Sequence, residues 1–168
     1  MNQLYVITGP AGVGKSTISR EIAKSKNKSV LIEGDEIYDQ VVGGYVPAWK
    51  EGNHLDVFWK ICLDNIETYL EAGYDVIFNY IVTPTIFNEI EKRYRKYNTK
   101  FIVLIADEET LLKRDKERVE DCRMGERCIA LLNSFKSYNF ENKYFLDTTN
   151  LEIKEIVEKI ENDNSILI

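Results

Sequence analysis

The chain has 168 residues, of which 44% are hydrophobic and 30% charged, and its formal net charge at pH 7 is −6. This length and composition are typical of one globular domain, and an acidic surface repels the backbone of nucleic acids, so we expect no nucleic-acid partner. No apolar run reaches the roughly 20 residues of a membrane-spanning helix and no secretory-signal pattern is present, so we expect a cytoplasmic protein without a membrane partner.

Short apolar runs alternate with amphipathic stretches along the whole chain. The nearly continuous Val, Ile, Leu and Phe of the short runs is typical of strands buried on both faces of a parallel sheet. Strands are predicted at residues 3–8, 29–33, 74–80, 100–106 and 143–147. Helices are predicted at residues 15–24, 53–73, 108–119 and 127–137, from Pro84 onward, and after Asn150, which should cap the last one. This order predicts a doubly wound α/β sheet in a single domain, residues 1–168.

Residues 9–17 read Gly-Pro-Ala-Gly-Val-Gly-Lys-Ser-Thr and follow the first predicted strand directly. They match the G-x-x-x-x-G-K-[ST] pattern of a phosphate-binding loop, in which glycines let the backbone N–H groups point into one concavity. Lys15 should reach the β- and γ-phosphates, and the Ser16 hydroxyl should ligate Mg²⁺. Nucleotide binding is therefore predicted for Gly9, Ala11, Gly12, Val13, Gly14, Lys15, Ser16 and Thr17.

Asp35 comes just after the second predicted strand, in Glu33-Gly34-Asp35. Ligands of such folds bind beyond the carboxyl ends of the strands, so we expect Asp35 to face the same crevice as Lys15. A carboxylate there can take the proton of a substrate hydroxyl or hold Mg²⁺ through water. The alternative is that Asp35 caps a helix.

Four arginines follow the fourth predicted strand: Arg114, Arg118, Arg123 and Arg127. Arg114 and Arg118 are four residues apart and share one helix face. Guanidinium groups suit phosphoryl transfer, which spreads negative charge over the moving group. The alternative is a solvated helix, because Asp115, Glu117, Glu120 and Asp121 are interleaved with the arginines. We interpret Asp107 as the cap of that helix.

Aromatic residues gather between positions 38 and 59, where Lys50 is the only lysine or arginine. Such a segment near the crevice suits a small, partly apolar acceptor and argues against a nucleoside monophosphate. Trp59 lies on the apolar stripe of a helix and should be core. Trp49 lies between Pro47 and Gly52 and is a candidate for the lining of the acceptor pocket.

The order of these motifs resembles small P-loop kinases. The resemblance is carried by residues 9–17, by Glu33-Gly34-Asp35, by the arginine series, which begins at Leu111-x-x-Arg114-x-x-x-Arg118, and by Asp147-Thr148-Thr149-Asn150-Leu151. Over nearly its full length the chain is similar to the shikimate kinase, gluconate kinase and chloramphenicol phosphotransferase group of the nucleoside-monophosphate-kinase-like fold. The resemblance implies a three-layer α/β sandwich with five parallel strands in the order 2-3-1-4-5.

The same resemblance implies roles for individual segments. Asp35 would be the base toward the acceptor hydroxyl, and residues 36–60 would bind the acceptor. Residues 119–127 would form a lid that closes over ATP and brings Arg123 and Arg127 to the phosphates. Residues 148–151, with Thr149 and Asn150, would lie beside the adenine. Asn79 departs from the pattern because many P-loop proteins have an aspartate at the end of this strand, so Mg²⁺ would be held by Ser16 and water, with Asp35 acting through water.

We therefore predict an ATP-dependent phosphotransferase that moves the γ-phosphate of ATP, with Mg²⁺, to a hydroxyl of a metabolite or antibiotic, acting as a monomer or homodimer. One alternative is a nucleotide or nucleoside kinase. Another is a P-loop NTPase or nucleotide-binding module that transfers no phosphate. Its GTPase version is disfavoured, because Asn142-Lys143-Tyr144-Phe145 lacks the final aspartate of the guanine motif.

Overall fold

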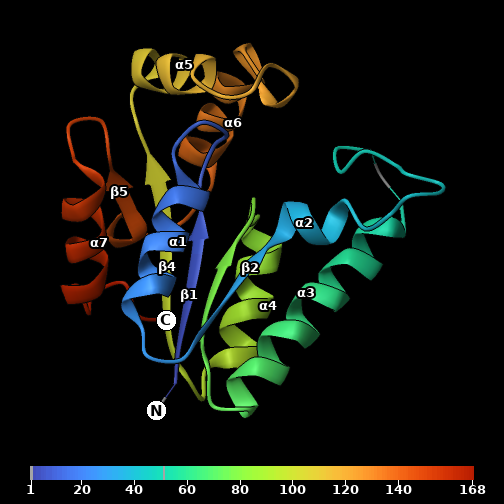
Figure 1. The fold of residues 1–168 in the computed structure, drawn as a ribbon, viewed down its shortest axis with the longest axis vertical. Helices are drawn as coiled ribbons and strands as arrows, with labels where there is room; N and C mark the ends of the chain where they lie inside the picture. The colour runs from blue at the N-terminus through green and yellow to red at the C-terminus, as the bar shows by residue number, and fades with distance from the viewer. Residues whose placement is uncertain (1, 51) are drawn as a thin grey trace.

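The core of the molecule is a five-stranded parallel sheet (Figure 1). The computed structural model describes residues 2–50 and 52–168. The strands are β1 (Gln3–Thr8), β2 (Ser29–Glu33), β3 (Asp75–Asn79), β4 (Asn98–Ile105) and β5 (Phe145–Asp147), and their order is β2-β3-β1-β4-β5. In the central strand Leu4, Val6 and Ile7 are fully buried, which explains the continuous apolar run. The predicted fold class and strand order are confirmed.

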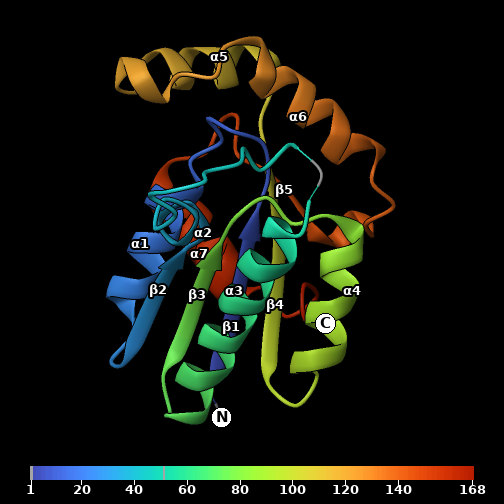
Figure 2. The same cartoon turned by 90° about the vertical axis from the view of Figure 1, so that its right-hand side faces the viewer.

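Helices cover both faces of the sheet (Figures 1 and 2). They are α1 (Lys15–Ser25), α2 (Gly34–Tyr38), α3 (His54–Glu71), α4 (Pro84–Tyr94), α5 (Glu108–Lys116), α6 (Glu126–Ser137) and α7 (Ile153–Asn162). α1 and α7 lie on one face and α3 and α4 on the other, while α5 and α6 lie above the carboxyl ends of the strands. None of the helices in the described part of the chain has the length and apolar character to cross a membrane.

The ends of several elements differ from the sequence prediction. The last helix begins at Ile153 and is capped by Glu152 rather than by Asn150. Glu152 and Glu155 form a capping box. The Glu152 side chain accepts a hydrogen bond from the backbone N–H of Glu155, and the Glu155 side chain accepts one from the backbone N–H of Glu152. α5 ends at Lys116 and not at 119, because residues 120–122 form a short 3₁₀ turn (Glu120–Cys122). A second 3₁₀ turn, Asn142–Tyr144, shortens β5 to three residues.

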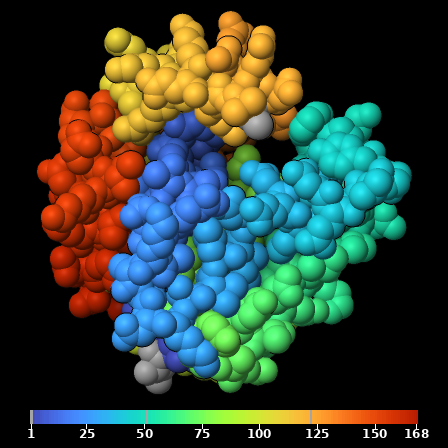
Figure 3. Space-filling model, in the orientation of Figure 1, coloured from blue at the N-terminus to red at the C-terminus, as the bar shows by residue number. Residues whose placement is uncertain are grey.

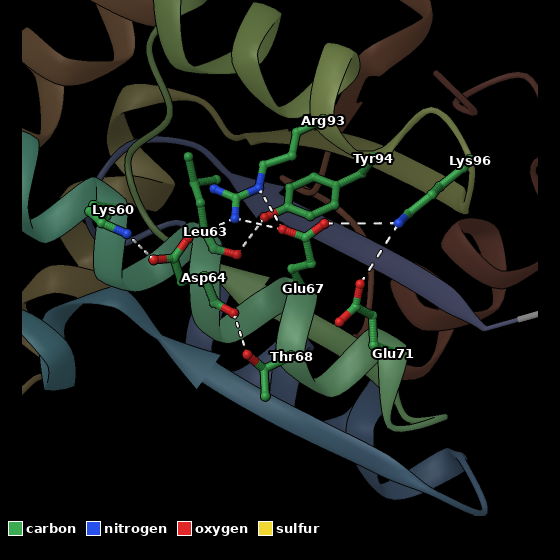
Figure 4. A network of polar contacts seen from close by, with 9 residues as sticks. All are labelled: Lys60, Leu63, Asp64, Glu67, Thr68, Glu71, Arg93, Tyr94 and Lys96. Atoms are coloured by element: carbon green, nitrogen blue, oxygen red, sulfur yellow. Dashed lines mark hydrogen bonds and ion pairs between the residues drawn. The ribbon is translucent and has the colours of Figure 1, made fainter.

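Ion pairs fasten α3 to α4 on the outer surface (Figure 4). Arg93 Nη2 lies 2.7 Å from Asp64 Oδ1 and 2.6 Å from Glu67 Oε2. Beneath them the Tyr94 hydroxyl donates a hydrogen bond of 2.6 Å to the carbonyl oxygen of Leu63. This network therefore joins the middle of α3 to the end of α4.

Candidate active site

The phosphate-binding loop connects β1 to α1 at the centre of the sheet. Gly9 lies against β4, where a Cβ atom would be 2.2 Å from the carbonyl oxygen of Leu104, so this position has no space for a side chain. Gly14 has φ of +99° at the N-cap position of α1, a left-handed conformation that glycine adopts without strain. The backbone N–H groups at the start of α1 and the helix dipole make this point attractive to anions.

Lys15 is the first residue of α1 and is partly buried beside the loop. Its Nζ donates hydrogen bonds to the carbonyl oxygens of Gly9 (3.0 Å) and Pro10 (2.9 Å). Burial lowers the pKa of Lys15 to about 8, and the nearby Asp35 carboxylate acts in the opposite direction. The ammonium group is thus held at the edge of the cavity by neutral oxygens only, and its contact with phosphates stays a prediction.

A cavity of about 450 Å³ lies above the loop, beneath α5 and the segment that follows it (Figure 3). This volume is within the range of small-molecule sites. The lining consists of residues 11–18, Asp35, Tyr80, Ile81, Arg114, Glu117, Arg118, Met124, Leu151, Ile153 and Ile156. The structure therefore brings the loop together with Asp35 and two of the four arginines.

Asp35 lies in the first turn of α2, exposed to the cavity. The N-cap position of this helix belongs to Glu33, so the alternative role of Asp35 as the helix cap is not realised. The preceding Gly34 is buried against Tyr80, whose ring carbon Cδ2 would be 2.5 Å from a Cβ atom at Gly34. Burial, and then the charge of Asp35, raise the pKa of Tyr80 above its usual range. The sequence analysis did not single out Tyr80, although it directly follows the strand that ends in Asn79.

Arg114, from α5, and Arg118, from the segment just after it, both line the cavity. Arg114 donates hydrogen bonds to Thr148 Oγ1 (3.0 Å) and to the carbonyl oxygens of Thr148 (2.9 Å) and Val13 (3.4 Å). It therefore joins the phosphate-binding loop to the turn after β5. Arg118 Nη1 lies 3.4 Å from Asp115 Oδ1.

Asp115 lies outside the cavity but contacts Arg118 and the turn at Met124, which line it. The sequence analysis missed this role, because it grouped Asp115 with the charges of a solvated helix face. The side chain is buried, with 2% of the residue exposed. Its Oδ2 accepts hydrogen bonds from the backbone N–H groups of Gly125 (2.8 Å) and Met124 (3.0 Å). Burial alone would raise the pKa of Asp115, but these bonds and Arg118 lower it below its usual value. Asp115 shares a helix face with the buried Leu111, and an acid on an apolar face was the available signal.

Arg123 and Arg127, which were predicted to be catalytic, are not among the residues that line the cavity. Arg123 Nε donates a hydrogen bond of 3.0 Å to the carbonyl oxygen of Arg118. The guanidinium carbon of Arg127 lies 4.0 Å from the ring centroid of Trp49. Their approach to phosphates stays a prediction that requires movement of segment 119–127.

Thr149 and Asn150, which were predicted to lie beside the adenine, do not line the cavity; other residues near the turn after β5 do. Thr149 Oγ1 accepts a hydrogen bond from the Asp107 N–H (2.9 Å) and donates one to Asp147 Oδ1 (2.7 Å). Asn150 is exposed, and neither residue lines the cavity. Leu151 and Ile153 line it instead, and their apolar side chains suit the flat face of a base.

The residues at the loop fit a magnesium ion. The Ser16 hydroxyl and the Asp35 carboxylate line the same cavity and offer the oxygen donors that Mg²⁺ prefers. Mg²⁺ commonly takes only one or two protein ligands beside water and phosphate oxygens, so this small donor set is sufficient. Asn79 is buried and does not line the cavity.

Comparisons with known proteins agree with this geometry. A model of the AAA domain family matches residues 6–153. The guanylate kinase of Clostridium tetani is 22% identical over 180 aligned positions, which cover 95% of this chain and 83% of that protein. A tunicamycin resistance protein of Deinococcus radiodurans has a TM-score of 0.70 at 19% identity, with 95% of this chain and 94% of that chain covered. A sugar kinase of a Janibacter species has a TM-score of 0.76 at 15% identity, with 99% and 96% covered.

The family model spans most of the chain, including the phosphate-binding loop and the arginine series. The solved structures cover nearly the whole length and share the sheet and its flanking helices. The resemblance seen in the motifs is thereby confirmed. This chain belongs to the AAA domain family and has the fold of the small P-loop kinases.

Proposed function

We propose that the protein is a phosphotransferase that moves the γ-phosphate of ATP to a hydroxyl group of a small molecule. One observation carries this proposal: a single cavity is lined by the phosphate-binding loop, by Arg114 and Arg118, and by the Asp35 carboxylate. The loop and arginines suit a nucleotide triphosphate, whereas an exposed carboxylate suits an acceptor hydroxyl. A module that only binds nucleotide could use that carboxylate for Mg²⁺, but it has no need of a base for an acceptor hydroxyl.

In the proposed reaction the acceptor oxygen attacks the γ-phosphorus and its proton passes to the Asp35 carboxylate. The bond between the γ-phosphorus and the bridging oxygen breaks, and ADP leaves with that oxygen. Arg118 and the ammonium group of Lys15 stabilise the negative charge on the transferred group. Mg²⁺, held by Ser16 and through water by Asp35, would neutralise phosphate charge when bound. Transfer to water is limited when the acceptor and segment 119–127 cover the cavity.

The proposed acceptor is small, largely uncharged and partly apolar. On segment 36–60 Val41, Val42, Tyr45 and Trp49 expose apolar surface. Tyr38 is packed edge-on against Tyr45 and donates a hydrogen bond of 2.5 Å to the carbonyl oxygen of Val46, which gives the segment a fixed shape. An antibiotic or a neutral metabolite suits such a surface better than a phosphorylated acceptor. The name of the tunicamycin resistance protein supports the antibiotic version, and that of the sugar kinase the metabolite version.

A nucleotide kinase is the second candidate, favoured by the similarity to the guanylate kinase. A nucleoside monophosphate carries a doubly charged phosphate, which requires cations in the acceptor pocket. Lys50 is the only lysine or arginine between residues 38 and 59. A thermal-shift screen of guanosine monophosphate, nucleosides, sugars and antibiotics with a non-hydrolysable ATP analogue separates the two, because a bound acceptor raises the Tm.

The role of Asp35 is tested by Asp35→Asn, with Asp39→Asn as the matched control. Asp39 is the exposed residue that ends the same short helix and does not line the cavity. Asp35→Asn should bind the ATP analogue almost as the parent does, yet lower transfer from ³²P-labelled ATP to the acceptor by about 10²–10⁴-fold, the usual effect of losing a general base. Asp39→Asn should transfer phosphate at the parent rate. Transfer by Asp35→Asn at that rate would refute the assignment.

A further inference from the structure

The exposed indole of Trp49 and the guanidinium of Arg127 are in contact outside the cavity, since neither residue lines it. Arg127 Cζ lies 4.0 Å from the centroid of the Trp49 ring, which is the geometry of a cation–π contact. Trp49 belongs to segment 36–60 and Arg127 to the first turn of α6, so the contact joins two regions far apart in sequence. Figure 3 shows these regions side by side, the first in cyan and the second in orange.

Arg127 lies close to the cavity without lining it. Its backbone N–H donates a hydrogen bond of 3.1 Å to the carbonyl oxygen of Met124, and Met124 lines the cavity. The backbone around Met124 is held by Asp115, whereas the long side chain of Arg127 is held by the face of Trp49. To reach the phosphates the guanidinium must leave Trp49, and segment 119–127 must move with it, so this contact holds the segment in its present place.

We propose that Trp49 is the resting site of Arg127, and that the phosphates of ATP withdraw Arg127 and thereby uncover the indole face for the acceptor. This inference rests on the proposed function. An exposed cation–π contact changes an equilibrium by only about twofold to fivefold, whereas a guanidinium on a phosphate forms charge-assisted, bidentate hydrogen bonds. Arg127 should therefore bind the phosphates of ATP more strongly than it binds the Trp49 ring.

The released face of Trp49 is a flat apolar surface, 63% of the residue being exposed even while Arg127 is in contact. A ring-containing or apolar acceptor can stack on the face that Arg127 covers only after Arg127 has left. Nucleotide would then strengthen acceptor binding, and by thermodynamic linkage the acceptor would strengthen nucleotide binding by the same factor. Trp49 is thus a positioning residue for Arg127 and a specificity residue for the acceptor.

Acrylamide quenching of tryptophan fluorescence tests the resting contact without any nucleotide. The parent for this experiment is Trp59→Phe, in which Trp49 is the remaining tryptophan. Adding Arg127→Met should raise the Trp49 quenching constant, because the guanidinium no longer covers one face. Adding Arg123→Met instead removes the same charge from a residue that contacts Arg118 and should leave the constant unchanged. Equal constants for the parent and Arg127→Met would overturn the proposal.

The same variants test the release by nucleotide. A non-hydrolysable ATP analogue with Mg²⁺ should raise quenching in the parent to the value of the Arg127→Met variant, and should have no further effect in that variant. Binding of the analogue is followed separately by competition with a fluorescent ATP derivative. If the analogue binds and quenching does not rise, Arg127 does not leave Trp49 and this inference is wrong. If the analogue does not bind at all, the proposed function itself is wrong.

The affinity of the Trp49→Ala variant for the ATP analogue distinguishes a resting site for Arg127 from a merely structural role of Trp49. Removing the resting site should tighten binding of the ATP analogue by about twofold to fivefold, because no contact has to be broken. Trp49→Phe keeps an aromatic face and should restore part of the parent affinity. Weaker nucleotide binding by Trp49→Ala would overturn the proposal.

Discussion

Replacing Asp115 by alanine should free segment 119–127 from the body of the protein. The buried carboxylate accepts hydrogen bonds from the backbone N–H groups of Gly125 at 2.8 Å and Met124 at 3.0 Å. Hydrogen bonds to a charged group contribute about 1.5–3 kcal/mol each. Met124 and Gly125 are exposed and can bond to water once the acid is gone, so the lower value applies, about 3 kcal/mol for the pair.

Hydrogen exchange of the backbone amides measures this loss directly. About 3 kcal/mol corresponds to roughly 100-fold faster exchange at Met124 and Gly125, since each factor of ten is about 1.4 kcal/mol. Asp115→Asn keeps one acceptor oxygen without the charge and should accelerate exchange by about tenfold. Lys113→Ala, an exposed change on the same helix, is the control. Unchanged exchange in Asp115→Ala would refute the idea that this carboxylate holds the segment.

The acid also sets a pH dependence with a definite sign. Because the folded state lowers the pKa of Asp115, its stabilising effect is fully present above the pKa of the unfolded chain, about 3.9. The effect is lost as pH falls through the lowered pKa of the folded state. Exchange at Met124 and Gly125 should therefore gain an extra, Asp115-dependent acceleration only under acidic conditions.

Two further predictions concern Lys15 and the ion pairs between α3 and α4. Because the pKa of Lys15 is about 8 and phosphate binds its protonated form, nucleotide affinity should be level below that pH. Above it, affinity should fall by up to about tenfold per pH unit, whereas Lys15→Arg should abolish the fall; a pH-independent dissociation constant in the parent would contradict this. Arg93→Met should lower the Tm slightly, because it removes the pairs with Asp64 and Glu67. The difference should shrink at about 1 M salt, and a salt-independent difference would assign the effect to packing.

The strands could be predicted from the sequence because they are short runs rich in apolar residues. Residues 3–8 and 29–33 have the predicted bounds, each strand being an apolar run with one polar residue at either end. The order of the strands came from the resemblance to small P-loop kinases, because apolar runs do not specify their neighbours. Asp107 caps α5 as predicted, with its side chain accepting a hydrogen bond of 2.7 Å from the Thr110 N–H.

What the sequence could not supply depends on contacts between distant segments. Asn150 is a good helix cap by type, but Glu152 and Glu155 form a reciprocal pair two residues later. Asp115 is acidic and flanked by charges, which outweighed its one local signal, the helix face that it shares with Leu111. The fold shows that Asp115 is buried and bonded to the turn at Met124. The contact of Arg127 with Trp49 spans 78 positions, and no local pattern indicates it.

The Asp115 carboxylate also contributes, after burial, to the low reactivity of the Cys128 sulfur. This thiol is fully buried at the base of the phosphate-binding loop, where a Cβ atom at Gly12 would lie 3.7 Å from it. Burial, and then the charge of Asp115, raise the pKa of Cys128 to about 11. Oxidants attack the thiolate, and at neutral pH only about one thiol in 10⁴ would be in that form. Resistance of Cys128 to oxidation is therefore set by its burial beside the phosphate-binding loop and by the charge of Asp115.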